Sequence, residues 1–440
     1  MSIRLVRLAV AGGPAPDVRT LLDTLNAFTA PRMLRRWQQM VLQDRAFGVA
    51  CPLDGVMLHC DATMWLEHSL FAYRFRHGAV TMWLMTHGCK TGWRLSGLAL
   101  MPLGLAFALD DNEDVALSGV HLQAIAGLEQ PDAAMAEAGP IQVVVGHPNF
   151  AHHLWNELPA LAAVAGTAPE ALVLWEPILP FERLVAWPGP VRRSSEAAER
   201  PTVPTLLPGI RLPLGSTLIP AALAASVRAA CLVDAPLPAW RPGAASLSLG
   251  LRSMYRPPVN QLDYARALLA RLPPSVDVYL DGFSMPGDID VPGRYDAGAF
   301  RIWQRDTAAM AHELIDSAPA GGPRLVNATD LSVAGSIALG SRLHAHVAPH
   351  GTQQHKFGWL WAMPGLVHSS PHVARDDQAD WLADQCELHG EVTYLPVEMV
   401  ETVAGAGPHA GHPWYDDYRF VDADGAASYT AQALARHLPG

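Results

Sequence analysis

The stretch LGSRLHAHVAPHGTQQHKFGWLWAMPGLVHSSP, residues 339–371, decides the fold of the C-terminal half of the chain. Residues 343–348 roughly alternate apolar and polar side chains and end in an apolar pair, which is typical of a short strand entering a packed sheet. Pro349 ends this strand, and a helix follows the turn that begins with His350 and Gly351. A strand that leads through a glycine turn into a helix is the repeating unit of an α/β sheet.

The turn after this strand predicts an anion-binding site. The first backbone N–H groups of a helix are unpaired and lie at the positive end of the helix dipole. Here they follow the carboxyl end of a strand, which is where α/β proteins bind anions such as a diphosphate. We therefore expect these residues to contact a ligand: His350, Gly351, Thr352, Gln353, His355 and Lys356.

Lys356 is notable because of the composition of the chain. Of 31 Lys and Arg residues only two are lysines, Lys90 and Lys356. A lysine in a polar, glycine-containing turn indicates that a compact point charge is needed to bind the diphosphate. The wide guanidinium group of arginine does not supply such a charge. The alternative is that Lys356 is an ordinary exposed helix residue.

Length and composition bound the class of protein. With 440 residues the chain is long for one core, so two domains of about 200 residues each are expected. A formal net charge of −11 without a Lys/Arg-rich run argues against a general nucleic-acid binder. The five cysteines have irregular spacings and no C-x-x-C pair, which is typical of reduced, buried thiols in a cytosolic protein.

Two apolar segments bear on the compartment. The apolar run at the N-terminus is too short for a signal peptide, and residues 95–109 are too short and too interrupted by Gly and Pro for a membrane span. We expect a cytoplasmic protein without a transmembrane segment, for which peripheral contact with the inner face of the membrane remains open.

The order of predicted elements indicates two domains. The N-terminal domain, residues 1–235, carries a β-rich insertion at about 48–125, and Pro-rich residues 236–242 predict the link to the next domain. The C-terminal domain, residues 244–400, alternates strands and helices, and a tail at 401–440 ends in a helix that could cross back to the first domain. This pattern predicts two doubly wound, Rossmann-like α/β domains facing a cleft.

A second informative stretch, GHPNFAHHLWNELPAL, spans residues 146–161 and follows a strand of mostly β-branched residues at 141–145. In the helix that begins here, His152 and Asn156 are i,i+4 neighbours, and so are His153 and Glu157. Such pairing orients an imidazole and raises its basicity, as a general base requires. The alternative is that the two histidines cap the helix or lie in solvent.

Three blocks, in this order, resemble glycosyltransferase family 61: NFAHHLWNELPAL at 149–161, SLGLRSMYR at 248–256 and HVAPHGTQQHKFGWLWAMPG at 346–365. The resemblance implies a GT-B architecture, with a nucleotide-sugar donor on the C-terminal domain and a saccharide or glycolipid acceptor on the N-terminal one. It also implies the kind of enzyme that acts in bacterial capsule or polysaccharide biosynthesis, without a cofactor and without a bound metal.

Carried over by position, the resemblance divides the site residues into two groups. Arg252, Arg256 and the turn from His350 to Lys356 would hold the donor diphosphate. The acceptor side would be formed by Asn149, His152, His153, Asn156 and Glu157. Thr352, Gln353 and Gln354 stand where the family usually has a small residue and another glycine, so the contacts to the donor sugar are expected to differ.

The residues predict direct, inverting displacement at the anomeric carbon. His152, His153 or Glu157 would remove the proton of the acceptor hydroxyl, while Arg252, Lys356 and helix N–H groups stabilise the departing diphosphate. No D-x-D pair of the metal-chelating kind lies beside this turn in sequence; Asp288 and Asp290 form such a pair, but in a distant Pro/Gly loop. The sequence leaves open the donor, the acceptor and the oligomeric state.

Two other classes of function compete with this one. A metal hydrolase would use the crowded histidines His344, His346, His350 and His355 as ligands. A non-catalytic carbohydrate- or partner-binding protein would stack sugar rings on tryptophans, and the candidates are Trp155, Trp359 and Trp361. Hydrolysis of a nucleotide sugar separates an enzyme from a binding module, because a binding module releases no nucleotide.

Overall fold

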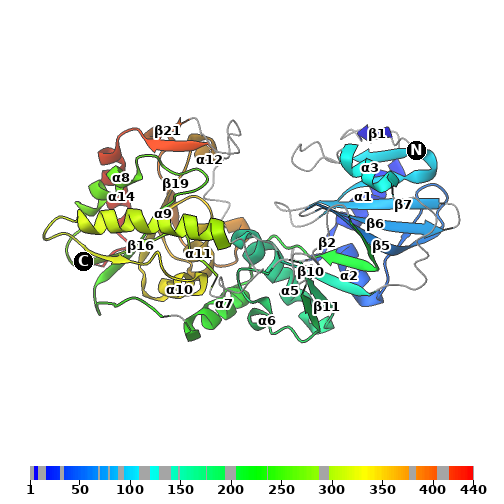
Figure 1. Ribbon diagram of the computed structural model, residues 1–440, viewed down its shortest axis with the longest axis horizontal. Helices are drawn as coiled ribbons and strands as arrows, with labels where there is room; N and C mark the ends of the chain where they lie inside the picture. The colour runs from blue at the N-terminus through cyan, green and yellow to red at the C-terminus, as the bar shows by residue number, and fades with distance from the viewer. Residues whose placement is uncertain are drawn as a thin grey trace. The chain divides into compact units, whose positions relative to one another are not determined.

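The computed structural model divides the chain into two compact units (Figure 1). Unit 1 comprises residues 1–177 and 185–218, and unit 2 comprises residues 178–184 and 219–440. The structure describes residues 4–7, 16–29, 34–67, 70–77, 80–87, 94–108, 119–127, 140–146, 149–174, 176–193, 205–234, 236–286, 297–375, 383–403 and 416–439. No helix in these ranges has the length and apolar character needed to cross a membrane.

Unit 1 contains a large sheet of eight strands, in which only the pair β1/β9 is parallel. The strand order is β1-β9-β8-β7-β6-β5-β13, and β4 also pairs with β5. The strands are β1 (Arg4–Arg7), β4 (Gly48–Ala50), β5 (Met57–Glu67), β6 (Leu70–His77), β7 (Val80–His87), β8 (Arg94–Leu100), β9 (Leu105–Ala108) and β13 (Thr205–Pro208).

Both faces of this sheet are covered by apolar side chains of other elements. On one face Met64, Trp83 and Met85 pack against Leu122 and Ile125 of α3 (Gly119–Gly127). On the other face an aromatic group is formed by Trp37, Phe47, Tyr73 and Phe75, in which Trp37 and Phe47 stack with ring centroids 5.2 Å apart. Trp37 comes from α2 (Arg36–Asp44), which follows α1 (Pro16–Asn26) and the two-residue strands β2 (Phe28–Thr29) and β3 (Leu34–Arg35).

A second, four-stranded parallel sheet has the order β12-β11-β10-β14. Its strands are β10 (Ile141–Val145), β11 (Glu170–Val173), β12 (Val191–Arg193) and β14 (Ile210–Pro213), and the strand predicted at 141–145 is confirmed. Helical residues between β10 and β11 are α4 (Phe150–His152), a π-helix (His153–Glu157), α5 (Leu158–Val164) and a 3-10 turn (Ala165–Thr167). One face of this sheet, carrying Val144 and Leu172, packs on Trp65 and Phe71 of the large sheet.

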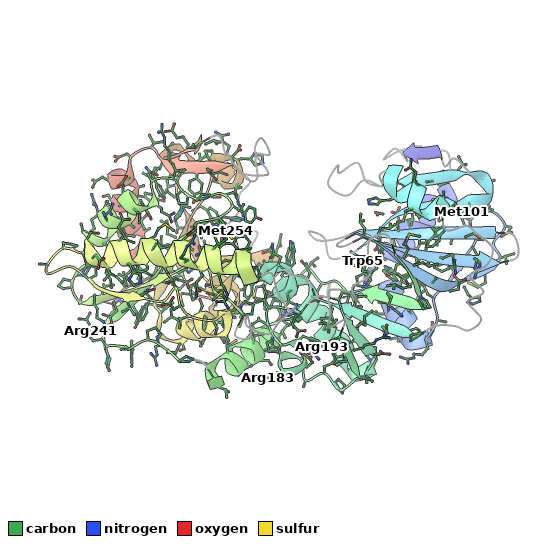
Figure 2. The ribbon with its side chains drawn as sticks, in the orientation of Figure 1. Trp65, Met101, Arg183, Arg193, Arg241 and Met254 are labelled. Carbon is green, nitrogen blue, oxygen red and sulfur yellow. The ribbon has the colours of Figure 1, made fainter. Side chains whose placement is uncertain are left out.

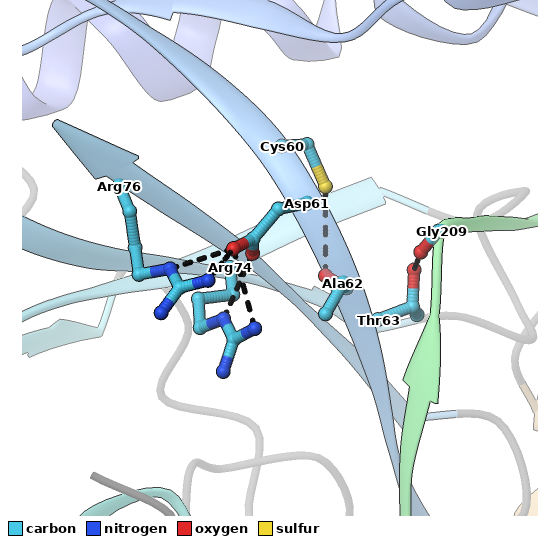
Figure 3. A network of polar contacts seen from close by, with 7 residues as sticks. All are labelled: Cys60, Asp61, Ala62, Thr63, Arg74, Arg76 and Gly209. Carbon is cyan, nitrogen blue, oxygen red and sulfur yellow. Dashed lines mark hydrogen bonds and ion pairs between the residues drawn. The ribbon is translucent and has the colours of Figure 1, made fainter. Parts of the chain in front are cut away.

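The two sheets of unit 1 meet at Gly209, which has φ +82° and separates β13 from β14. Thr63 of β5 fixes the corner, because its Oγ1 donates to the Gly209 carbonyl at 3.0 Å and accepts the Arg211 N–H at 3.0 Å. Figure 3 shows Thr63 and Gly209 beside a charged network in which Asp61 accepts from Arg74 and Arg76 of β6. One run of residues, 205–213, therefore contributes a strand to each sheet.

Unit 2 contains a six-stranded parallel sheet with the order β17-β16-β15-β18-β19-β20. In chain order this is 3-2-1-4-5-6, the arrangement of doubly wound dinucleotide-binding sheets. The strands are β15 (Ala245–Gly250), β16 (Val276–Asp281), β17 (Arg324–Asn327), β18 (Ala345–Pro349), β19 (Gly365–His368) and β20 (Val392–Tyr394). A separate antiparallel pair is formed by β21 (Val400–Val403) and β22 (Asp417–Phe420).

Helices cover both faces of the parallel sheet. On one face Leu247, Leu249 and Val278 pack with residues of α8 (Gln261–Leu269), α9 (Ala297–Asp316) and α14 (Ala423–Leu434). On the other face Tyr279 packs with Leu339 of α10 (Val333–Leu339). Unit 2 also contains the helices α6 (Phe181–Leu184), α7 (Ala221–Asp234), α11 (Thr352–Trp361) and α12 (Pro371–Arg375).

Three expectations about the organisation of the chain need revision. The division falls at Leu218 and Ile219, before the Pro-rich residues 236–242, because α7 packs on α10 and α11 and so belongs to unit 2. The final helix α14 packs on α8 of its own unit. The parallel sheet of unit 1 has the strand order 3-2-1-4 in chain order, as in a doubly wound sheet, but side chains of the large sheet pack on one of its faces where helices were expected.

Gly365 of β19 tests how tightly unit 2 is packed. A Cβ at this position would lie 2.3 Å from Cε1 of His346, which is buried on the neighbouring strand β18. We expect Gly365→Ala to lower the free energy of unfolding by about 1–3 kcal/mol, the range for overpacking a core. Urea denaturation of the variant measures this loss.

A matched control comes from α10. A Cβ on Gly335 would meet no atom closer than 3.4 Å, so Gly335→Ala should leave stability equal or higher through better helix propensity. Replacing His346 by Ala in the Gly365→Ala background should restore part of the loss. Equal stability of Gly365→Ala and wild type would contradict the packing described here.

Candidate functional site

The candidate site lies at the carboxyl edge of the parallel sheet in unit 2, where the strand order reverses between β15 and β18. Open α/β sheets bind their ligands at this point because the connections leave the two strands in opposite directions. The loop 251–256 follows β15, and His350 and Gly351 follow β18. The structure thus brings together the second and third sequence blocks, which are about a hundred residues apart in the chain.

Gly351 begins α11 with φ 124° and ψ −147°, a conformation that only glycine adopts readily. A Cβ at this position would lie 3.0 Å from Nη2 of Arg252 and 3.5 Å from Nη2 of Arg256. Two guanidinium groups therefore lie against the backbone at the start of the helix. Glycine is required here both for its backbone angles and for the space that the arginines occupy.

Four hydrogen bonds fix the Arg252 loop to its surroundings. Gln261 of α8 accepts the Arg252 N–H at 3.0 Å and donates to the Arg252 carbonyl at 2.6 Å. Nη1 of Arg252 donates to the His350 carbonyl at 3.0 Å, and Nε2 of Gln353 donates to the Leu251 carbonyl at 2.6 Å. The loops after β15 and β18 are thus joined directly and form one surface.

Positive charges gather at this edge. Burial and the neighbouring Arg256 charge lower the pKa of Arg252 to about 9, so the guanidinium is still charged at neutral pH. Burial, together with Arg256, His355 and Arg252, holds the pKa of His350 well below its usual range, and the neutral ring shares a 2.9 Å hydrogen bond with Tyr394 through Nδ1. The positive end of α11 adds to the two guanidinium charges. An anion placed here would relieve the repulsion between the arginines.

Lys356 lies at this edge but does not contribute to its exposed surface, and its side chain is only 4% exposed. Its Nζ donates to Asp281 Oδ2 at 2.7 Å, to Ser336 Oγ at 2.7 Å and to Ser284 Oγ at 3.3 Å. These three acceptors account for all three N–H donors of an ammonium group. In this conformation Lys356 therefore has no N–H donor left for the expected contact with a diphosphate, and its role is structural. The alternative of an exposed lysine is wrong.

The other residues expected on the donor side have different surroundings. His355 is buried and stacks on Trp359 with ring centroids 3.8 Å apart. Thr352 is partly exposed in the first turn of α11, while Gln353 is buried. Gln354 accepts the Gly351 N–H at 3.4 Å. Sequence reasoning missed Gln261, Tyr394 and Ser336, which carry no local motif. Asp281 is followed by Gly282, and an Asp-Gly pair is a turn signal that could have pointed to the end of a strand.

In unit 1 the structure confirms both i,i+4 pairs predicted after β10. Nδ1 of His152 lies 2.8 Å from Oδ1 of Asn156, whose Nδ2 donates to the Ser216 carbonyl at 2.6 Å. Nδ1 of His153 contacts Oε2 of Glu157, and Oε1 of Glu157 accepts the Gly146 N–H at 2.9 Å. Asn149 is the helix cap, since its side chain accepts the Ala151 N–H at 2.9 Å. The predicted pairing is therefore present at the carboxyl end of β10.

Residues of both pairs lie in a π-helix. The Leu158 N–H bonds to the His153 carbonyl, five residues back, and Pro159 supplies no N–H for the next bond. Burial distinguishes the three candidates for the general base. His153 is 0% exposed and Glu157 is 5% exposed with both oxygens engaged, so neither reaches an acceptor in this conformation. Of the three candidates for the base, His152 alone is partly exposed.

The crowded histidines of the metal hypothesis do not form one cluster, although the rings of His350 and His355 lie near each other with centroids 6.3 Å apart. His344 bonds to Ser246 at 3.0 Å through Nδ1, His350 bonds to Tyr394, and His346 packs beside Phe357 with ring centroids 5.9 Å apart. The described ranges contain no group of three or more His, Cys, Asp or Glu side chains arranged to hold a metal ion. Asp288 and Asp290 lie outside the described residues.

The tryptophans of the carbohydrate-binding hypothesis are mostly buried. Trp155 is 5% exposed and Trp359 is 1% exposed. Trp361 is partly buried, and its Nε1 donates to the Ile337 carbonyl at 2.7 Å. Trp155 and Trp359 are therefore buried, and the Arg228 guanidinium lies over the Trp361 ring, with its Cζ 5.3 Å from the ring centroid.

Comparison with known proteins gives no family for this chain. No protein-family model matches the sequence, and no curated protein matches it significantly.

Replacing Lys356 tests its structural role. Lys356→Met would leave the Asp281 carboxylate, whose side chain is 1% exposed, without its counter-charge. Breaking a buried ion pair in this way costs about 3–5 kcal/mol of unfolding free energy, whereas replacing both partners by apolar residues recovers most of it. Denaturation of Lys356→Met and of Lys356→Met/Asp281→Leu measures both effects. Wild-type stability of the single variant would refute the assignment.

Buried neutral histidines predict acid sensitivity. Burial lowers the pKa of His346 to about 4, and burial with the Arg252 charge lowers the pKa of His368 to about 3. An unfolded histidine titrates near pH 6.5, so the unfolded chain binds more protons below that pH and stability falls on acidification. Each histidine contributes up to about 1.4 kcal/mol per pH unit between pH 6.5 and its folded pKa.

Chemical denaturation between pH 7 and pH 5 measures this loss. His346→Gln should show a shallower loss than wild type, because one buried titrating ring has been removed. An unchanged slope would show that His346 does not contribute to the acid sensitivity.

Proposed function

We propose that this chain is a glycosyltransferase that uses a nucleotide-sugar donor, and that the carboxyl edge of the parallel sheet in unit 2 binds the donor diphosphate. The observation that carries the proposal is Gly351, whose glycine-only backbone holds the N-terminus of α11 against the guanidinium groups of Arg252 and Arg256. The resemblance to glycosyltransferase family 61 supports the same assignment, because its second and third blocks supply these residues.

The proposed chemistry is displacement of a nucleoside diphosphate from the anomeric carbon. As that bond breaks, negative charge grows on the β-phosphate oxygen, and two fixed guanidinium groups with a helix N-terminus stabilise it without reorganising. Arg252 is suited to this role because hydrogen bonds to Gln261 and His350 already hold its backbone and side chain. Preorganised charge lowers the barrier more than charge that must move into place.

The acceptor half of the proposal concerns unit 1 by itself. His152 is the proposed base because it is partly exposed and its Nδ1 is held by Asn156, which orients the ring. His153, Glu157 and the π-helix are proposed to support this position and to take no part in proton transfer. The identity of the donor sugar and of the acceptor is left to experiment.

Arg252→Ala tests the donor site. Loss of a hydrogen bond to a charged group costs about 1.5–3 kcal/mol, so nucleoside diphosphate binding should weaken by roughly 10- to 150-fold. Arg252→Lys should recover only part of this, because a point charge cannot reproduce the planar fork. Calorimetry with a panel of nucleoside diphosphates measures each affinity.

Arg436→Ala serves as the control, because this exposed arginine of the same unit pairs with Glu391 and should leave binding unchanged. Release of nucleoside diphosphate from the matching nucleotide sugar then separates an enzyme from a binding module. Equal nucleotide affinity of wild type and Arg252→Ala, or no nucleotide binding at all, would overturn the proposed function.

A further inference from the structure

A cluster of four aromatic rings adjoins the proposed diphosphate site. Trp303 of α9 lies at its centre, with ring centroids 6.1 Å from Tyr255, 5.2 Å from Phe283 and 5.7 Å from Phe300. Tyr255 belongs to the loop after β15, and Phe283 follows β16. The cluster therefore lies at the same carboxyl edge of the sheet as Arg252 and Gly351.

The rings of this aromatic cluster are incompletely covered. Tyr255 is 44% exposed, and Phe283, Phe300 and Trp303 are all only partly buried. Large aromatic side chains usually stabilise a fold by complete burial, so four partly exposed rings in mutual contact are typical of a surface that receives a ligand.

The loop that carries Arg252 and Arg256 is also connected to the aromatic cluster. Oγ of Ser253 donates to the Trp303 carbonyl at 3.2 Å, which joins the Arg252 loop to α9. Tyr255 has φ 41° and Arg256 has φ 60°, so two successive residues adopt the left-handed conformation that most side chains avoid. This backbone places an aromatic ring next in sequence to a guanidinium group that lies against Gly351. Strain of this kind is typical of ligand-binding loops.

We propose that the aromatic cluster binds the nucleobase of the donor nucleotide, with Tyr255 as its exposed stacking ring. The inference rests on the proposed function, since a nucleoside diphosphate carries its base one ribose away from the phosphates that Arg252 and Arg256 would bind. Aromatic side chains stack on any nucleobase, because every base has a π-face. The cluster thus supplies affinity for the nucleoside part, and the arginines supply affinity for the diphosphate.

The test compares three ligands on three variants of the full chain. Tyr255→Ala removes the exposed ring, and Tyr255→Phe keeps the ring without the hydroxyl. Trp240→Ala is the matched control, because Trp240 is also 44% exposed in unit 2 but precedes β15, at the opposite end of that strand. Figure 2 labels Arg241, the next residue after Trp240, and Met254 of the Arg252 loop. The ligands are the best nucleoside diphosphate of the panel, inorganic diphosphate and a sugar 1-phosphate.

Tyr255→Ala should bind the nucleoside diphosphate about tenfold more weakly, in line with the loss of one stacking contact. Its affinity for inorganic diphosphate should be unchanged, and Tyr255→Phe and Trp240→Ala should both match wild type. An equal loss for all three ligands, or a loss confined to the sugar 1-phosphate, would overturn the inference while leaving the anion site in place. Wild-type affinity of Tyr255→Ala for the nucleoside diphosphate would do the same. Failure of the wild-type chain to bind any nucleoside diphosphate would overturn both the inference and the proposed function.

Discussion

The buried ion pair between Lys356 and Asp281 is the contact on which the ligand-binding edge of unit 2 depends. It joins the end of β16 to the second turn of α11, and the same ammonium also bonds to Ser336 of α10. Buried ion pairs contribute little net stability, because desolvation offsets their attraction, but they define positions sharply since a mispaired charge is costly. The position of α11 fixes Gly351 and the N-terminus of the helix. The electrostatics of the whole edge follow from that position.

Lysine and arginine have separate tasks at this edge. A lysine ammonium is compact and directs three donors to three acceptors, which suits the closed space among Asp281, Ser284 and Ser336. The planar guanidinium groups of Arg252 and Arg256 lie against the backbone of Gly351, where a side chain would collide with them. This division explains why a chain with only one other lysine, Lys90, has a lysine at position 356.

Patterns local in sequence predicted the strands and turns of this site, and contacts between distant segments did not follow from them. The alternation and Pro349 identified β18, and the glycine turn identified the start of α11. The i,i+4 rule identified the pairs of His152 and His153, because helix geometry fixes those neighbours. The burial of Lys356 could not be predicted in the same way. Its partner Asp281 lies 75 positions away, and no residue adjacent to Lys356 indicates the pairing. For the same reason the sequence did not predict that Gln261 bonds to Arg252 or that Tyr394 bonds to His350. It also did not predict that one sheet of unit 1 packs on the other.

The corner at Gly209 has a consequence for how unit 1 is assembled. The β-rich stretch is bounded by β1 on one side of the sheet and β13 on the other, and β13 is contributed by residues 205–208. The large sheet therefore cannot be excised as a separate segment, since its edge strand β13 and strand β14 of the parallel sheet come from one continuous run of chain. Closure of long loops precedes such non-local pairing and slows folding. During synthesis the large sheet remains incomplete until more than 200 residues have left the ribosome. Until then the edge of β5 that pairs with β13 has no partner strand.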